Sequence, residues 1–181
     1  ILTTIEFLVG PIRGKSKTHL ITGYVHAAYP PVYSDLAKVS GFDSAILVKG
    51  VEGGVAPSLR GDGKIFYYND DDEMKEKKFN AKDLDINHKM RAVPLPELEK
   101  VEEIKLDEIS SDINVEDFSQ KAAEIGLLAL DGKDGPAKDT LIFTASIALS
   151  IIKRIQFTDA ADQIKKAINS GKAKEFFYNA R

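Results

Sequence analysis

The chain has 181 residues, a length typical of one domain, and its 43% hydrophobic and 29% charged residues are typical of a globular protein. The formal net charge of −3 at pH 7 excludes a chain-wide electrostatic attraction to nucleic acid. The absence of cysteine excludes disulfide bonds and catalysis by a thiolate.

The longest charge-free segment near the C-terminus, residues 140–152, is too short to cross a bilayer, which takes about 20 apolar residues. Residues 1–20 lack the basic region, apolar region and cleavage site of a secretory signal peptide. We therefore expect no membrane span and a cytoplasmic location.

The first 17 residues contain a mostly apolar segment, residues 5–9, which the Gly10-Pro11 pair ends as a turn. A loop with three cations follows, at Arg13, Lys15 and Lys17. This pattern is typical either of a solvated loop or of a phosphate contact, and both readings stay open.

Residues 18–54 predict a β-α-β unit. The expected strand at 18–25 is followed by a turn at Pro30 and Pro31, a helix over 32–40 and a second strand over 44–49. The second strand contains a continuous apolar run, as in a strand covered on both faces of a largely parallel sheet. Ligands of such units are usually held at the carboxyl ends of the strands, so the loop of residues 49–54 is the first place to expect a site.

This loop supplies residue types that suit an anionic ligand. Glycine lets a backbone approach a ligand closely and expose N–H groups to it. The residues that we expect to contact substrate or phosphate are Lys49, Gly50, Gly53, Gly54 and Arg60, together with Arg13 and Lys15 of the preceding loop.

A charged region follows. Asp62-Gly63 predicts a turn before a strand over 64–68, and the acidic run 70–73 is typical of an exposed turn, with cation binding as the alternative. From residue 69 to about 112 we expect short strands and loops with at most one edge hairpin. None of His19, His26 and His88 has a second histidine nearby to make a metal pair, so we expect structural roles for them.

The last 70 residues or so predict helices. Asn114 is expected to cap a helix that runs to about Leu130, and Gly135-Pro136 to start a second helix that is apolar almost all round. Thr158 is expected to cap a third helix that Gly171 ends, before a short amphipathic segment.

Several segments, taken together and in order, resemble the C-terminal part of anthranilate phosphoribosyltransferase and its relatives in glycosyl transferase family 3. They cover nearly the whole chain: Leu8-Val9-Gly10-Pro11, Val48-Lys49-Gly50, Gly135-Pro136-Ala137-Lys138-Asp139 and Ile168-Asn169-Ser170-Gly171-Lys172-Ala173. The resemblance implies an α/β fold like the catalytic domain of nucleoside phosphorylases and phosphoribosyltransferases, with a largely parallel central sheet flanked by helices and a helical C-terminal third.

The family resemblance also implies an activity, the transfer of a phosphoribosyl group from phosphoribosyl pyrophosphate to an amine with Mg²⁺, as in tryptophan biosynthesis, and a homodimer. The chain opens on Ile1 without an initiator methionine, and the family's helical N-terminal domain and glycine-rich phosphate loop have no counterpart in it. We therefore expect residues 1–181 to form one domain, the C-terminal portion of a larger protein, whose missing part is its partner.

The sequence departs from the family where the metal would bind. A gapless alignment from Lys49-Gly50 places Val55 and Ala56 at the family's Asp-Glu pair, and apolar side chains cannot coordinate Mg²⁺. Glu52 is the one nearby carboxylate. Gly23-Tyr24-Val25-His26 and Lys49-Gly50-Val51-Glu52-Gly53 resemble the divergent second-type branch, so the alternative is a non-catalytic relative that binds nucleic acid or another polyanion through Arg13, Lys15, Lys17 and Lys49.

Overall fold

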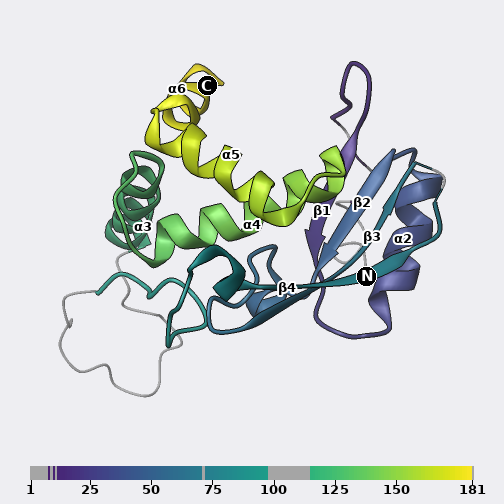
Figure 1. Cartoon of the computed structure of the whole chain (residues 1–181), viewed down its shortest axis with the longest axis horizontal. Helices are drawn as coiled ribbons and strands as arrows, with labels where there is room; N and C mark the ends of the chain where they lie inside the picture. Colours follow the sequence, from purple (N-terminus) through teal and green to yellow (C-terminus); the bar gives the residue numbers. More distant parts are fainter. Residues whose placement is uncertain (1–7, 9, 11, 71, 98–114, 181) are drawn as a thin grey trace.

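The computed structural model describes residues 8, 10, 12–70, 72–97 and 115–180 (Figure 1). Four strands form one sheet in the order β1-β2-β3-β4. The elements, in chain order, are β1 (His19–Gly23), α2 (Tyr29–Val39), β2 (Ser44–Val48), the 3-10 turn η2 (Val51–Gly53), β3 (Asp62–Asn69), β4 (Lys75–Asn80), the 3-10 turn η3 (Ala81–Leu84), α3 (Val115–Leu130), α4 (Pro136–Lys153), α5 (Phe157–Asn169) and α6 (Lys172–Asn179).

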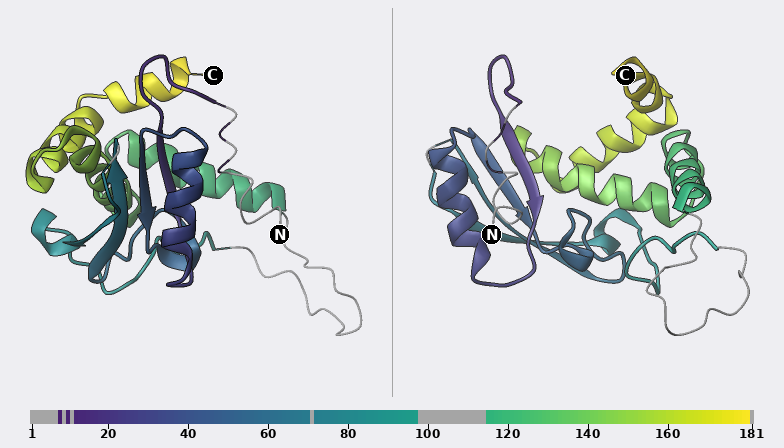
Figure 2. Two further views of the ribbon diagram at one scale, coloured as in Figure 1. Left: turned by 90° about the vertical axis from the view of Figure 1, so that its right-hand side faces the viewer. Right: turned by 180° about the vertical axis from the view of Figure 1, so that it is seen from behind.

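The sheet lies between two helical layers. Helix α2 covers one face, and α4 with α5 covers the other, as the rotated views show (Figure 2). The α/β class with a sheet flanked by helices and a helical C-terminal third is therefore confirmed. None of the described helices combines the length and apolar character that a membrane crossing requires.

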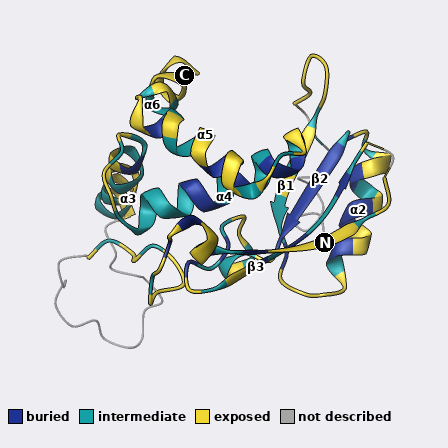
Figure 3. Ribbon diagram, in the orientation of Figure 1, coloured by how far each residue is buried: buried dark blue, intermediate teal, exposed yellow. Residues whose placement is uncertain are grey.

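Strand β2 is buried along its whole length (Figure 3). Ala45 and Leu47 point into the core under α2, while Ile46 and Val48 point into the larger core under α4 and α5. A strand with both faces covered needs apolar residues at every position, which explains the uninterrupted run in the sequence.

The direction of strand pairing differs from the prediction of a largely parallel sheet. The pair β1–β2 is parallel, whereas β2–β3 and β3–β4 are antiparallel, so the sheet is mixed. The reason is how the strands are connected. A helix connects β1 to β2 and carries the chain back to the other end of the sheet, as a parallel pair requires. The 49–61 connection from β2 to β3 contains only the 3-10 turn η2, and a short turn joins β3 to β4, so both connections return the chain antiparallel.

Several element boundaries also differ. Pro30 and Pro31 belong to the first turn of α2, where proline is tolerated because those N–H groups have no helical partner. Asp62 and Gly63 already lie in β3, and Thr158 lies inside α5, for which Gln156 is the N-cap residue. The single edge hairpin is confirmed as β3–β4 within the described residues, and the predicted cap Asn114 lies outside them.

A tyrosine anchors the smaller core. The Tyr68 side chain is fully buried, and its hydroxyl donates a hydrogen bond of 3.0 Å to the Phe42 carbonyl oxygen. Burial, followed by the charge of Asp43, raises the pKa of Tyr68 to about 12. The folded state therefore keeps this proton at a pH where the unfolded state has lost it.

We expect the folded chain to lose stability as the pH rises from 10 towards 12. A folded-state pKa above the unfolded value contributes stability below the unfolded pKa, and that contribution disappears as the pH passes the folded one. Urea unfolding at pH 8, 10 and 11.5 should show this decrease, and Tyr68→Phe should reduce it. An unchanged pH slope in the variant would contradict the assignment to Tyr68.

Candidate functional site

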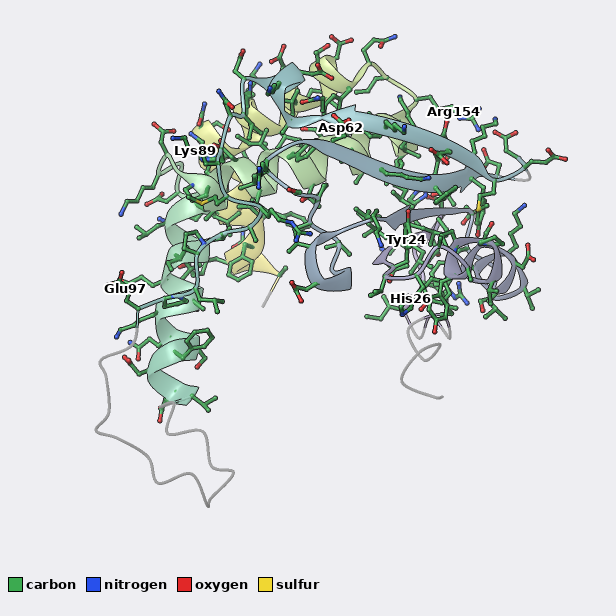
Figure 4. The ribbon with its side chains drawn as sticks, turned by 90° about the horizontal axis from the view of Figure 1, so that it is seen from below. Tyr24, His26, Asp62, Lys89, Glu97 and Arg154 are labelled. Atoms are coloured by element: carbon green, nitrogen blue, oxygen red, sulfur yellow. The ribbon has the colours of Figure 1, made fainter. Side chains whose placement is uncertain are left out.

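The carboxyl ends of β1 and β2 lie side by side. The parallel register pairs Gly23 with Val48, the last residues of the two strands, and the Tyr24 N–H donates a 3.0 Å hydrogen bond to the Val48 oxygen. The chain then enters η2. We call this end of the sheet the carboxyl edge. Figure 4 views it from below, with Tyr24 and His26 on one side and Lys89 and Glu97 on the other.

The turn of residues 49–54 is closed by its own hydrogen bonds. The Val51 N–H donates to the Ala56 oxygen at 2.9 Å, and the Gly54 N–H donates to the Val51 oxygen at 2.9 Å. Glu52 and Gly53 both have positive φ angles, of 53° and 78°. Glycine adopts that conformation freely, whereas a glutamate there is uncommon and marks Glu52 as a residue held in place by the turn.

Two glycines allow the turn to pack closely against neighbouring backbone. A Cβ atom on Gly23 would overlap the carbonyl oxygens of Gly53 and Gly54, and one on Gly50 would overlap the Gly54 oxygen. Part of the glycine pattern is therefore explained by backbone packing within the protein. Gly53 and Gly54 place their carbonyl oxygens beside β1.

Lys49 lies at the start of the turn with an exposed side chain. Its Nζ donates a hydrogen bond to the Val25 carbonyl oxygen and lies 5.4 Å from the centroid of the Tyr24 ring. An ammonium group carries three donors, so this position leaves donors for a ligand while the side chain is held at the carboxyl edge.

Arg60 comes just before β3. Because β3 runs antiparallel to β2, the start of β3 and the end of β2 lie at the same edge of the sheet. Arg60 is exposed, and its backbone N–H donates to Ser58 Oγ at 3.3 Å. The structure thus brings Lys49, Gly50, Gly53, Gly54 and Arg60 to the carboxyl edge.

The other predicted cations lie at the opposite end. Arg13, Lys15 and Lys17 precede β1, and with about 3.3 Å per strand residue the length of β1 separates them from Lys49 by roughly 16 Å or more. Arg13 donates to the Ser40 oxygen, and Lys17 Nζ pairs with Asp70 Oδ1 at 2.5 Å. These residues and Lys49 do not form one cluster, so the groove expected for a polyanion would have to run the length of β1 to combine them, and it stays a prediction.

The amino end of β1 and β2 contains a polar cavity of about 390 Å³ that the sequence did not predict. Asp70 bridges Lys17 and Arg154, with Arg154 at 3.0 Å, and the Lys17 hydrogen bond lowers the pKa of Asp70. His19 Nδ1 lies 2.7 Å from Ser44 Oγ. No single motif could reveal this cavity, because its lining comes from the 12–17 loop, the amino ends of β1 and β2, the carboxyl end of β3 and the end of α4. The lining residues are Ser16, Lys17, His19, Asp43, Ser44, Asn69, Asp70, Ile152, Lys153 and Arg154.

The other two histidines also have nearby partners. His88 Nε2 lies 2.6 Å from Asp139 Oδ2 and connects its loop to the first turn of α4. The His26 ring lies 5.8 Å from that of Tyr29. These contacts agree with the structural roles expected from the sequence.

The carboxyl edge does not offer the ligand set that a protein-bound Mg²⁺ needs. Glu52 is the single carboxylate between Lys49 and Arg60, and Val55 and Ala56 supply only apolar side chains. Asp62, the next carboxylate, accepts a 2.6 Å hydrogen bond from Asn80. Across the part of the chain that the structure describes, no group of three or more His, Asp and Glu side chains is placed to hold a metal ion.

Two further cavities, of about 330 and 430 Å³, flank α3 and are lined mainly by apolar side chains. The first lies between α3 and residues 93–97, and the second reaches Phe177 of α6. Neither contains a residue that the sequence singled out for phosphate binding.

A sheet between two helical layers places the chain in the α/β class. No family model and no curated protein matches the sequence. Solved structures of anthranilate phosphoribosyltransferases do share the fold. Their identities to this chain, 10–17%, support the fold alone.

Similar structures from two organisms illustrate the likeness. The enzyme from Saccharomyces cerevisiae with 4-fluoroanthranilate has a TM-score of 0.58 at 16% identity, and the same enzyme with phosphoribosyl pyrophosphate and Mg has 0.56 at 15%. The enzyme from Thermus thermophilus has 0.50 at 10%. Each comparison covers 87% of this chain and 40% of the other, so the chain spans less than half the length of these enzymes.

Proposed function

We propose that this chain is the C-terminal α/β portion of a larger phosphoribosyltransferase-like protein, and that its carboxyl edge binds the phosphate groups of phosphoribosyl pyrophosphate. The observation that carries the proposal is the placement of Lys49, Arg60 and the glycine turn at one edge of this fold. One solved structure with the same fold contains phosphoribosyl pyrophosphate.

The chemistry of the turn suits that role. Phosphate oxygens accept hydrogen bonds from ammonium, guanidinium and backbone N–H groups, and bonds to a charged group are stronger than neutral ones. Lys49 is held by Val25 with donors to spare, and Arg60 is exposed towards the same end of the sheet, just before β3. In this proposal the two cations hold the pyrophosphate and offset its charge as it leaves.

The described residues contain no group of three or more His, Asp and Glu side chains placed to hold a metal ion, so no step is assigned to a protein-bound metal. In the intact protein, the proposed activity is phosphoribosyl transfer to an amine acceptor, with the remaining contacts supplied by a glycine-rich phosphate loop and a helical domain outside these 181 residues. Binding of nucleic acid is not supported, because the basic loop and Lys49 lie at opposite ends of β1.

We expect the 181-residue chain to bind phosphoribosyl pyrophosphate weakly, and Lys49→Gln and Arg60→Gln each to weaken binding about fivefold, as loss of roughly 1 kcal/mol implies. Isothermal titration calorimetry, with Mg²⁺ and with EDTA, would measure the dissociation constants of the wild type and of the two variants. Glutamine at position 49 can still donate to Val25, which protects the fold.

The control is Lys166→Gln, which removes one positive charge from an exposed position on α5. This variant should bind like the wild type. Lys15→Gln tests the other end of the sheet and should also have no effect. If Lys15→Gln weakens binding while Lys49→Gln and Arg60→Gln do not, the site lies at the amino end and the proposal is wrong.

A further inference from the structure

A polar cavity of about 350 Å³ lies between the β3–β4 hairpin and the junction of α4 with α5. We call it the hairpin recess. Its volume falls in the range of small-molecule sites, about 300 to 1,000 Å³. Three of the side chains that line it are cationic and one is acidic. The lining residues are Tyr67, Asn69, Asp72, Lys75, Lys77, Ser150, Ile151, Arg154, Ile155 and Gln156.

The hairpin recess lies at the end of the sheet opposite the carboxyl edge. The strand register pairs Asn69, the last residue of β3, with Ser44, the first residue of β2. Arg154 lies beside this end of the hairpin, where it pairs with Asp70 (Figure 4). The recess is therefore separate from the edge that we expect the missing part of the protein to complete.

Strand β4 supplies two of the cations. Alternate residues of a strand share one face, so Lys75 and Lys77 lie on the same face as Phe79, which is buried in the core under α4 and α5. Lys75 Nζ pairs with Asp72 Oδ2 at 3.1 Å. Lys77 Nζ lies 4.9 Å from the Phe79 ring centroid, and among the described residues no carboxylate pairs with it. An anion between the two lysines would offset their mutual repulsion.

Arg154 supplies the third cation from a position that usually holds glycine. Its N–H donates to the Ile151 oxygen at 3.3 Å and the Ile155 N–H donates to the Ser150 oxygen at 3.1 Å, the Schellman arrangement at the end of a helix. The φ angle of Arg154 is 55°, which glycine adopts freely and other residues do not. The helix end alone therefore favours glycine and does not explain an arginine. The guanidinium donates one bond to Asp70, at 3.0 Å, out of five N–H donors.

Uncharged groups complete the lining. Asn69 Nδ2 donates to the Ile151 oxygen at 3.1 Å, which fixes the end of the hairpin to the end of α4. Gln156 is exposed at the N-cap of α5, and its side chain makes no capping hydrogen bond, so its amide group can donate to a ligand. Tyr67 lies opposite Lys75 in the strand register. This set of donors, with three positive charges against one negative charge, suits an anion.

We propose that the hairpin recess binds a small oxyanion with a charge of −2 or more, either a phosphate monoester or a di- or tricarboxylate. The oxygen atoms of both accept charge-assisted hydrogen bonds from lysine and arginine. The recess shares no residue with the phosphate site at the carboxyl edge, so either site can exist without the other.

The test is a titration of the ¹⁵N-labelled chain with inorganic phosphate, with citrate and with acetate, at constant ionic strength. Phosphate, citrate or both should shift the amides of residues 75–77 and 154–156 and saturate with one dissociation constant of a few millimolar. Acetate, which carries a single charge, should bind at least tenfold more weakly. The stronger of the two multivalent anions identifies the class of ligand.

Variants separate the recess from general attraction to positive charge. Arg154→Gly should weaken binding at least tenfold while the melting temperature stays equal or rises, because glycine suits this helix end and an exposed ion pair contributes little stability. Lys77→Gln should weaken binding about fivefold. The matched control, Lys78→Gln, removes one positive charge from the opposite face of β4 and should bind like the wild type.

Two kinds of result would overturn the proposal. One is the absence of saturable shifts at residues 75–77 and 154–156 with either multivalent anion. The other is an equal effect of Lys77→Gln and Lys78→Gln, because binding would then follow net charge. Shifts confined to residues 50–54 and 60 would overturn the recess and leave the carboxyl edge standing. Conversely, Lys49→Gln should keep the shifts of the recess, so the two sites are tested separately.

Discussion

Replacement of Gly23 by alanine is expected to destabilise the chain by about 2 to 3 kcal/mol, which lowers the melting temperature by roughly 5 to 10 °C. The added Cβ would overlap the carbonyl oxygens of Gly53 and Gly54, so either β1 or the turn has to move. Both are backbone, and backbone atoms held by hydrogen bonds cannot yield as a flexible side chain can. Thermal unfolding followed by circular dichroism would measure the change.

Gly61→Ala is the matched control. A Cβ at Gly61 meets no atom within 4 Å, and Gly61 does not have a positive φ angle. Its melting temperature should stay close to that of the wild type or rise slightly, because alanine reduces the freedom of the unfolded chain. Equal stability of Gly23→Ala and Gly61→Ala would show that the turn does not pack on β1 as described. Gly23→Ala should also weaken binding of phosphoribosyl pyrophosphate, since the turn carries the proposed site.

Phe143→Ala is expected to cost about 3 to 5 kcal/mol, the range for a fully buried aromatic side chain. Phe143 is 0% exposed in the core between the sheet and α4, and its ring lies 6.0 Å from that of Phe157. A Cβ atom on Gly63, at the start of β3, would lie 3.4 Å from Phe143 Cζ, so the Phe143 ring packs beside this glycine. Its loss would leave a cavity at the contact between the helical layer and the sheet.

Urea unfolding would measure this loss against Val39→Ala, which shortens a side chain that is 86% exposed on α2. The control should change the free energy of unfolding by less than about 0.5 kcal/mol. A similarly small effect of Phe143→Ala would mean that α4 does not pack on the sheet through this residue.

The sequence predicted the inner strand well and the direction of the sheet poorly. The apolar run of β2 has a simple physical cause, since two cores need a side chain at every position. The direction of β3 depends on the path of the chain between residues 49 and 61, where only the 3-10 turn η2 intervenes. Pro30 and Pro31 were ambiguous because proline suits both a turn and the first turn of a helix.

The separation of the cations was within reach of the sequence. In a β-α-β unit the two strands are parallel, so a loop before the first strand and a loop after the second must lie at opposite ends. That rule alone separates Arg13, Lys15 and Lys17 from Lys49. The polar cavity around Asp70 and Arg154 was out of reach, because residues 70 and 154 meet only through the packing of α4 on the sheet.

The role of the glycine turn was also only partly predictable from the sequence. Its pattern suggested a close approach to a ligand, and the sequence had no means to show that Gly23 and Gly50 make room for neighbouring backbone. This packing does not remove the proposed phosphate site, because it shapes the turn and fixes its position relative to β1. Lys49 and Arg60 are then the residues on which ligand binding depends.

The most direct measurement for the central claim is a titration of the ¹⁵N-labelled chain with phosphoribosyl pyrophosphate, followed by amide chemical shifts. We predict that the amides of residues 50–54 and Arg60 shift with a common millimolar affinity, while those of residues 12–17 do not. Shifts confined to residues 12–19, 153 and 154, or no shifts at millimolar ligand, would contradict a phosphate site at the carboxyl edge.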